Sequence, residues 1–197
     1  MEISADIVKQ LRDKTNAGMM DCKKALQEAN GNLEQAMDLL RKRGLDIAAK
    51  KSSRATKEGV IAAYIHSNSK VGVLIEVCCE SDFVAKNTDF QTFVKDLTLQ
   101  IASAVPRYVT RDEVPAQVIE REKAIYREQV AGKPANIIDK IVDGKLEKFY
   151  KDVCLVDQLF VKDDKRTISD LLKEKIAQLG ENIAIRRFVR YQVGEEV

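Results

Sequence analysis

The sequence predicts an α+β fold, in which a helical N-terminal module precedes a small antiparallel sheet covered by helices. Apolar residues recur at helical spacing over the first 56 residues. From Gly59 the spacing changes to the alternation typical of strands, and capped helical patterns follow. We therefore expect a helical module with a basic connector over residues 1–56 and an α+β core over residues 57–197.

Three short helices are expected in the module. The first has an apolar face made of Ile3, Ile7, Val8 and Leu11. The stretch from Thr15 to Gly18 should end it, and Asp21 should cap the second helix. Asn32 and Gln35 resemble a capping box that opens the third helix, which Gly44 should end. The connector then carries the basic residues Lys50, Lys51, Arg54 and Lys57.

The core should begin with a β-hairpin. Runs at 60–66 and 70–80 are strand-like, and Ser67-Asn68-Ser69 joins them. The second run has one clearly apolar face, made of Val71, Val73, Ile75 and Val77. A last strand is expected over 183–193, and an extended stretch over 154–161.

Four helices should complete the core. A capping box at Thr88 opens a helix whose apolar stripe is Phe90, Phe93, Val94, Leu97 and Ile101. Two more helices should follow Pro115 and Pro134, since proline is common at helix starts. The fourth should run from Thr167 to Leu179, with Gly180 ending it.

Composition argues against several classes of protein. The chain has 197 residues with 33 basic and 31 acidic side chains, a net charge of +2. Dedicated nucleic-acid binders usually carry a clear basic excess. We therefore do not expect dedicated nucleic-acid binding from this protein. No apolar run approaches the length of a membrane span, and the N-terminal residues do not resemble a signal peptide. We expect a cytoplasmic protein that binds no membrane.

The residue types needed for enzymatic chemistry are scarce. The only imidazole, His66, lies near the end of a predicted strand without an evident partner. The glycines form neither a phosphate-binding loop nor a dinucleotide fingerprint. The acid pairs at 112–113 and 163–164 are typical of solvated caps and turns. The protein is therefore predicted not to be an enzyme, and to need no cofactor.

A metal site is not expected either. The adjacent Cys78 and Cys79 would point to opposite faces of a strand, so they could not grip one ion together. No Cys-x-x-Cys pair occurs. We expect reduced thiols at the four cysteines, Cys22, Cys78, Cys79 and Cys154.

Basic residues form two clusters that could contact phosphates. One follows the predicted third helix, and the other lies on the last strand at Arg186, Arg187 and Arg190. Neither alternates with stacking aromatic residues, apart from Phe188. A solvated face is the more ordinary interpretation of both.

The corner after the second predicted strand permits two interpretations. Ser81, Asp82, Phe83 and Val84 lie between this strand and the next helix. The corner could project an acid and a large aromatic ring outward as a wedge on a rigid base. Alternatively, Phe83 folds into the core and Asp82 caps a short helical turn. Pattern alone favours the second interpretation, because most phenylalanines are substantially buried.

Two long motifs resemble signatures of the elongation factor Ts family. They are the stretches 11–26 (LRDKTNAGMMDCKKAL) and 76–87 (EVCCESDFVAKN). Shorter matches follow in order along nearly the whole chain: Gly132-Lys133-Pro134, the neighbourhood of 144–146, the stretches 158–161 and 180–183, and Arg186-Arg187-Phe188. Two long motifs in the right order are far more specific than any short pattern.

The resemblance implies a nucleotide exchange factor for the GTPase elongation factor Tu, in its GDP-bound and nucleotide-free forms. In the family, a module like a ubiquitin-associated domain docks on the GTPase domain. Asp82 and Phe83 would intrude near the Mg²⁺ site of the partner, with Val84 supporting this wedge and Ser81 beginning the motif. Arg12, Met19 and Met20 match family positions that contact the GTPase domain.

The chain departs from the commonest family pattern. Ser81 stands where threonine is usual, and its hydroxyl should preserve capping. A second core subdomain found in long members is absent, so the chain resembles short members. These act as homodimers engaging two GTPases, which implies a two-plus-two complex through the core sheet. Some carry a cysteine in the last strand, whereas this strand has Phe188-Val189-Arg190, so the dimer should hold by noncovalent packing.

Two other functions stay open on sequence grounds. An RNA-associated basic protein would show salt-sensitive RNA affinity and no effect on GDP release. A general adaptor would bind peptides or ubiquitin-like partners through its helical head, with the core as a passive scaffold. Only the exchange-factor interpretation gives Asp82 and Phe83 a task.

Overall fold

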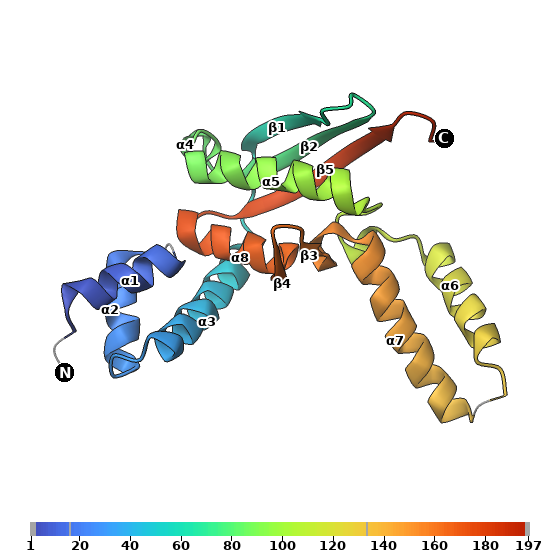
Figure 1. Ribbon diagram of the computed structural model, residues 1–197, viewed down its shortest axis with the longest axis horizontal. Coiled ribbons are helices and arrows are strands. Elements are labelled where there is room, and N and C mark those ends of the chain that lie inside the picture. The colour runs from blue at the N-terminus through green and yellow to red at the C-terminus, as the bar shows by residue number, and fades with distance from the viewer. Residues whose placement is uncertain (1–2, 16, 133, 196–197) are drawn as a thin grey trace. The chain divides into compact units, whose positions relative to one another are not determined.

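The structure, a computed structural model, describes residues 3–15, 17–132 and 134–195 (Figure 1). The chain divides into two units. Unit 1 comprises Met1–Val60, Val77–Phe93 and Asp170–Ala184, and unit 2 comprises Ile61–Glu76, Val94–Ser169 and Ile185–Val197. Each unit is gathered from segments that are distant in sequence. The two units do not test whether residues 1–56 fold alone, so the predicted boundary between residues 56 and 57 stays a prediction. The predicted α+β class is confirmed.

The N-terminal module consists of three packed helices, α1 (Ala5–Thr15), α2 (Met19–Glu28) and α3 (Leu33–Lys51). Asn32 Oδ1 accepts a hydrogen bond from the backbone N–H of Gln35 at 3.1 Å, so the predicted cap of α3 is confirmed. Small apolar side chains fill the centre and let the helices approach closely. The buried cluster contains Val8, Leu11, Cys22, Ala25, Leu26, Ala29 and Ala36.

Two predictions for the module were wrong. Helix α2 begins at Met19 with Gly18 as its N-cap, so Asp21 lies in the first turn, where its charge is favourable. Helix α3 continues through Gly44 to Lys51, so the connector is shorter than expected. A Cβ at Gly44 would lie 3.4 Å from the Ala177 Cβ, so the glycine permits close packing inside unit 1. Asn16 lies outside the described residues.

The predicted strands are confirmed as a three-stranded sheet of order β1-β2-β5, formed by β1 (Glu58–Ile65), β2 (Val71–Cys79) and β5 (Ile183–Gln192). The backbone N–H of His66 donates to the Val71 carbonyl at 2.9 Å and closes the predicted hairpin. The apolar face of β2 is confirmed, because Val73, Ile75 and Val77 are buried.

The helix α5 (Thr88–Ala104) buries the whole apolar stripe predicted for it. Its cap is Asn87 rather than Thr88, because Asn87 Oδ1 accepts from the backbone N–H of Asp89 at 2.7 Å. The carbonyl of Asn87 also accepts the first helical hydrogen bond, from Gln91. Helix α8 (Ile168–Leu179) ends at Gly180, whose φ of +74° is the left-handed conformation expected after a helix.

Unit 2 contains the two helices predicted after Pro115 and Pro134. They are α6 (Ala116–Gln129) and α7 (Ala135–Val153), which pack as a hairpin (Figure 1). Lys133 lies outside the described residues.

The stretch at 154–161 is extended only in part. Tyr108, which precedes the short 3₁₀ helix η1 (Arg111–Glu113), forms an isolated bridge with Cys154, which follows helix α7. A second 3₁₀ turn, η2 (Leu155–Asp157), precedes β3 (Leu159–Phe160). Strand β3 pairs antiparallel with β4 (Asp163–Thr167), where the sequence predicted a turn. The polar composition of β4 hides the strand from a pattern that depends on apolar alternation.

Candidate functional site

The corner after β2 holds an exposed aromatic ring on a buried base. The single-turn helix α4 (Asp82–Ala85) follows Ser81, which is its N-cap. Val84 and Ala85 are buried, and Asp82 and Phe83 lie on the opposite side of the turn because successive residues rotate by about 100°. Phe83 is 82% exposed. The favoured interpretation, with Phe83 in the core and Asp82 as a cap, was therefore wrong.

Local contacts fix the start of α4. Ser81 Oγ accepts from the backbone N–H of Val84 at 3.4 Å, and the Cys79 thiol donates to the Ser81 carbonyl at 3.1 Å. On the outer side, Lys86 Nζ lies 2.7 Å from Asp82 Oδ2, and this hydrogen bond with its charge lowers the pKa of Asp82. Exposed pairs of this kind contribute little to stability. The buried side and the cap hold the corner.

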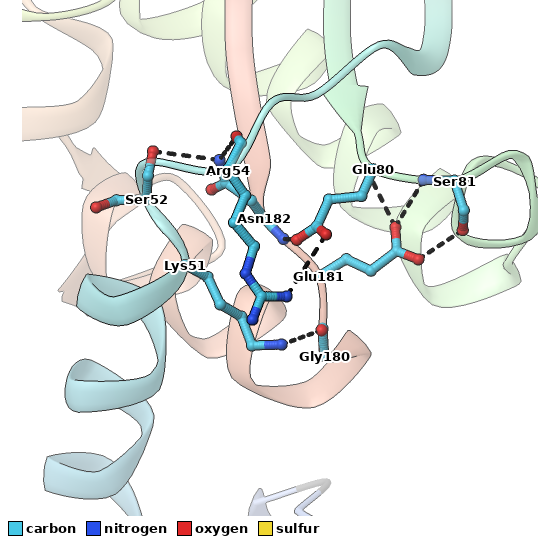
Figure 2. Close-up of polar contacts among 8 residues, drawn as sticks. All are labelled: Lys51, Ser52, Arg54, Glu80, Ser81, Gly180, Glu181 and Asn182. Atoms are coloured by element: carbon cyan, nitrogen blue, oxygen red, sulfur yellow. Dashed lines mark hydrogen bonds and ion pairs between the residues drawn. The ribbon is translucent and has the colours of Figure 1, made fainter.

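The carboxylate of Glu181, from a distant part of the sequence, binds the same corner (Figure 2). Glu181 Oε2 accepts from the backbone N–H groups of Glu80 at 3.1 Å and Ser81 at 2.9 Å. Its other oxygen, Oε1, accepts from the Ser81 hydroxyl at 2.5 Å. Hydrogen bonds to an ionised acceptor are roughly twice as strong as neutral ones. The end of β2 is thus bound at three donors by one side chain.

The residue after Glu181 ties the connector to the same place (Figure 2). The buried Asn182 donates from Nδ2 to the carbonyls of Arg54 at 2.8 Å and Ser52 at 3.3 Å. Its backbone N–H donates to Glu80 Oε1 at 2.6 Å. An Arg54–Glu80 ion pair at 3.6 Å and a hydrogen bond from Lys51 to the Gly180 carbonyl add to this network. Residues 180–182 therefore join the end of α3 to the base of α4 within unit 1.

The buried thiol beside this network should make the stability depend on pH. Burial, and then the charge of Glu181, raise the pKa of Cys79 from 9.0 to about 11. Below pH 9 the folded and unfolded chains both keep the proton. Between pH 9 and 11 only the unfolded chain loses it, so the folded state should lose about 2–3 kcal/mol from Cys79. Urea unfolding at pH 8 and pH 10.5 measures most of this loss, about 2 kcal/mol.

A Cys79→Ala variant is the control for this prediction. Cys154 is also buried with a pKa raised to about 11, so part of the pH dependence should persist in the variant. The loss between the two pH values should nevertheless be smaller than in the natural chain. An unchanged loss would show that Cys79 does not ionise as the structure indicates.

The three residues predicted on the module are exposed at one end of its helix pair. Arg12 is exposed on α1, and Met19 and Met20, which open α2, are 55% and 64% exposed. Thr15 Oγ1 donates to the Leu11 carbonyl at 2.7 Å at the end of α1. Two neighbouring unbranched thioether side chains form an adaptable apolar surface. They lie on elements of unit 1, as the corner does.

The predicted basic clusters are partly engaged within the protein. Arg187 Nε lies 2.6 Å from Glu76 Oε2, and Arg190 donates to the Ala102 carbonyl and to Gln192. Lys51 and Arg54 belong to the network described above. The exposed His66 accepts or donates one hydrogen bond with the Tyr64 hydroxyl at 2.8 Å.

The four cysteines are free thiols in the structure. Among the described residues, no three His, Cys, Asp or Glu side chains gather closely enough to hold a metal ion. No helix in the ranges 3–15, 17–132 and 134–195 has the length and apolar character to cross a bilayer.

Sequence reasoning missed the residues that brace the corner. Ser81, Asp82, Phe83 and Val84 are contiguous, so a motif could reveal them. Glu181 and Asn182 lie about 100 residues further on, and only the fold brings them to the corner. The one available signal was that 180–183 matched a family motif, which assigned them no role.

An exposed ring on a braced corner, together with exposed methionines on a helical module, is typical of α+β proteins that bind another macromolecule. Large apolar side chains presented on a rigid base are typical of the central contacts in protein interfaces.

Comparison with known proteins gives the family. The sequence model described as Elongation factor TS matches residues 1–195. Elongation factor Ts of Fervidobacterium nodosum is 57% identical over 197 residues, which cover 99% of this chain and 100% of the relative. That of Acetivibrio thermocellus is 55% identical over 99% of this chain and 92% of the relative. That of Thermotoga maritima is 53% identical over 99% and 98%. The chain belongs to the elongation factor Ts family, whose members are translation elongation factors.

Proposed function

We propose that this protein binds the GTPase elongation factor Tu and promotes release of its GDP, with Asp82 and Phe83 as the wedge that disturbs the Mg²⁺ site. The observation that carries the proposal is the 82% exposure of Phe83 on a braced corner, in a chain of this family. A single exposed apolar side chain is common on surfaces. Here, however, the ring stands on a turn whose other side is buried and whose backbone is held by Glu181.

The mechanism requires no covalent chemistry, so the protein would act without being an enzyme. GDP is held largely through its phosphates and the bound Mg²⁺, which is the largest local charge in such a site. A factor that binds the nucleotide-free GTPase better than the GDP-bound form must weaken GDP binding by the same factor. A hundredfold mutual weakening corresponds to about 2.7 kcal/mol of coupling. Rebinding of GTP then expels the factor.

The helical module would supply affinity rather than exchange. Arg12 adds a cation, and Met19 and Met20 add exposed apolar surface that can adapt to the partner. This division of roles makes two separable quantities: the half-saturating concentration reports docking, and the maximal release rate reports the wedge. Protein synthesis takes place in the cytoplasm, where we propose that the protein acts.

The experiment that tests the function is the release of fluorescent GDP from purified elongation factor Tu, followed after mixing with excess unlabelled GDP. Titration of the natural chain should raise the release rate to a plateau well above the spontaneous rate. A rate that stays at the spontaneous value across the titration would reject the exchange function. RNA binding with strong salt dependence would then be the alternative to measure.

A second copy of the chain is the proposed occupant of an exposed apolar sheet face in unit 2. A Cβ at Gly72 would lie 3.2 Å from Ile65 Cδ1, which places the neighbouring side chains of β1 and β2 on one face. The Arg187–Glu76 pair places alternate residues of β5 on the same face. This face contains Ile61, Ile65, Leu74, Val189 and Tyr191, which are 66%, 65%, 46%, 36% and 70% exposed.

The dimer proposal combines this face with the resemblance to short family members. Contiguous exposed apolar side chains on monomers commonly mark protein interfaces. In a twofold dimer the same patch contacts itself, so one substitution acts twice. The pair would engage two GTPases in a two-plus-two complex, and it would hold without an intermolecular disulfide.

Leu74→Lys should dissociate this dimer, because Leu74 lies on the central strand and the new charges would face each other. Light scattering should change from about 44 kDa, twice the 22.2 kDa chain, to about 22 kDa. Val161→Lys is the matched control, since Val161 is equally exposed but lies outside the sheet face. A natural chain that already has the mass of one copy would contradict the dimer.

A further inference from the structure

Glu181 is separated from the corner by 100 residues of sequence, yet its carboxylate binds the corner through both oxygens. Oε2 accepts hydrogen bonds from two backbone N–H groups, and Oε1 accepts one from the Ser81 hydroxyl (Figure 2). The hydroxyl proton is thereby committed to Glu181, which leaves the lone pairs of Ser81 Oγ for the Val84 N–H in the first turn of α4. The capping hydrogen bond of α4 and the grip of Glu181 are therefore two ends of one chain of hydrogen bonds.

We propose that Glu181 is the positioning residue of the exchange reaction: it fixes the direction of α4 and so aims Phe83 at the partner. This inference rests on the proposed exchange function. Glu181 would act through Ser81 and the backbone, and it need not touch the partner itself.

The need for such a residue follows from the size of α4. A helix of four residues is far too short to be stable by itself, because nucleation costs more than one turn returns. Phe83 projects into solvent, so its own packing cannot hold it. The orientation of the ring is therefore set by the base of the turn. Glu181 supplies a charged acceptor there. The backbone N–H of Asn182 donates to the Glu80 side chain and so holds the chain next to Glu181 in place.

A positioning role differs from a merely structural one in the quantity that it changes. If Glu181 aims the wedge, its loss should lower the maximal rate of GDP release while the half-saturating concentration stays nearly constant. The module with Met19 and Met20 would still dock. General destabilisation of the fold would instead remove active protein and change both quantities together with the unfolding midpoint.

The test is the GDP-release titration with the natural chain, Glu181→Ala and Glu181→Gln. Glu181→Ala should lower the maximal acceleration by about tenfold, because small misplacements of a positioned group have large effects on rate. Glu181→Gln keeps an acceptor oxygen for the backbone N–H groups, so it should retain a rate between those of the natural chain and Glu181→Ala. Asp170→Asn is the matched control, since Asp170 lies in the same segment and pairs with Arg41 at 3.6 Å. This variant should accelerate GDP release from elongation factor Tu as much as the natural chain does.

A double variant tests the route of action. If Glu181 acts partly through the Ser81 hydroxyl, then Ser81→Ala combined with Glu181→Ala should lower the rate by less than the product of the two single losses. Rate losses that multiply would show that the two residues act independently, and would overturn the proposal.

Amide hydrogen exchange gives a readout that does not depend on the partner. The amides of Glu80, Ser81 and Val84 should exchange faster in Glu181→Gln than in the natural chain, because a neutral amide oxygen is a weaker acceptor than a carboxylate, while those of α5 stay protected. Unchanged exchange at these three amides would overturn the proposal even if Glu181→Ala fails to fold.

The failures of the two claims are distinguishable. If the natural chain does not accelerate release, the exchange function itself is rejected. If the natural chain accelerates release and Phe83→Ala does not, but Glu181→Ala keeps the full maximal rate, the wedge stands and the role of Glu181 is wrong. A loss expressed only as a higher half-saturating concentration would likewise overturn the positioning role.

Discussion

Replacement of Phe83 by alanine is expected to remove most of the acceleration of GDP release while leaving the fold intact. Truncation of a central aromatic side chain in an interface commonly costs about 2 kcal/mol or more. If that energy is expressed at the release step, the maximal rate should fall roughly thirtyfold. The half-saturating concentration should change less, because the helical module still docks. Stopped-flow release of fluorescent GDP at saturating factor measures the effect.

The fold should tolerate this change because Phe83 is already 82% exposed. Surface substitutions of this kind usually change stability by no more than about 0.5 kcal/mol. Leu159→Ala is a suitable control, since Leu159 is an exposed apolar residue that belongs to unit 2 and is not part of the corner. If Phe83→Ala accelerates GDP release from elongation factor Tu as much as the Leu159→Ala control does, the wedge role of Phe83 is rejected.

Gly59→Ala should cause the largest loss of stability among single-atom additions to the hairpin. Gly59 has a φ of +150°, a conformation that residues with a Cβ rarely adopt. An added Cβ would lie 2.3 Å from the Val77 carbonyl oxygen and 2.7 Å from the Cys78 Cα. Both are backbone atoms of β2, so relief requires the strands to separate. We expect about 3 kcal/mol of destabilisation, measured by urea unfolding.

Gly144→Ala is the matched control for this experiment. Gly144 lies inside α7, and a Cβ there would meet no atom within 4 Å beyond its chain neighbours and the nearby backbone of its own helix. Alanine stabilises a helix interior by about 0.5–1 kcal/mol relative to glycine, so this variant should be more stable than the natural chain. Equal effects of the two substitutions would show that backbone conformation and the nearby carbonyl do not decide the outcome at Gly59.

The elements with strong periodicity could be predicted from the sequence. The stripe of α5 and the alternation on β2 both face the core as expected, because burial of apolar side chains dominates where the pattern is strong. Caps and helix ends were less predictable. Gly44 lies within α3 because a tertiary contact with Ala177 overrides the tendency of glycine to end helices. Strand β4 was missed because polar residues form it.

The candidate site could be predicted only where it is contiguous. Average burial placed Phe83 in the core, whereas the buried Val84 and Ala85 turn the ring outward. No local pattern indicates that Glu181 would meet Ser81, because that contact depends on how β5 and α8 return to the end of β2. The motif resemblance therefore singled out Asp82 and Phe83, and the fold showed which residues hold the turn that carries them.

Release of fluorescent GDP from elongation factor Tu by the natural chain is the most direct test of the central claim. We expect the rate to rise with the concentration of this protein to a plateau far above the spontaneous rate. Rebinding of GTP should then free the factor for further cycles. A release rate that stays at the spontaneous value, with folded protein and active elongation factor Tu, would contradict it.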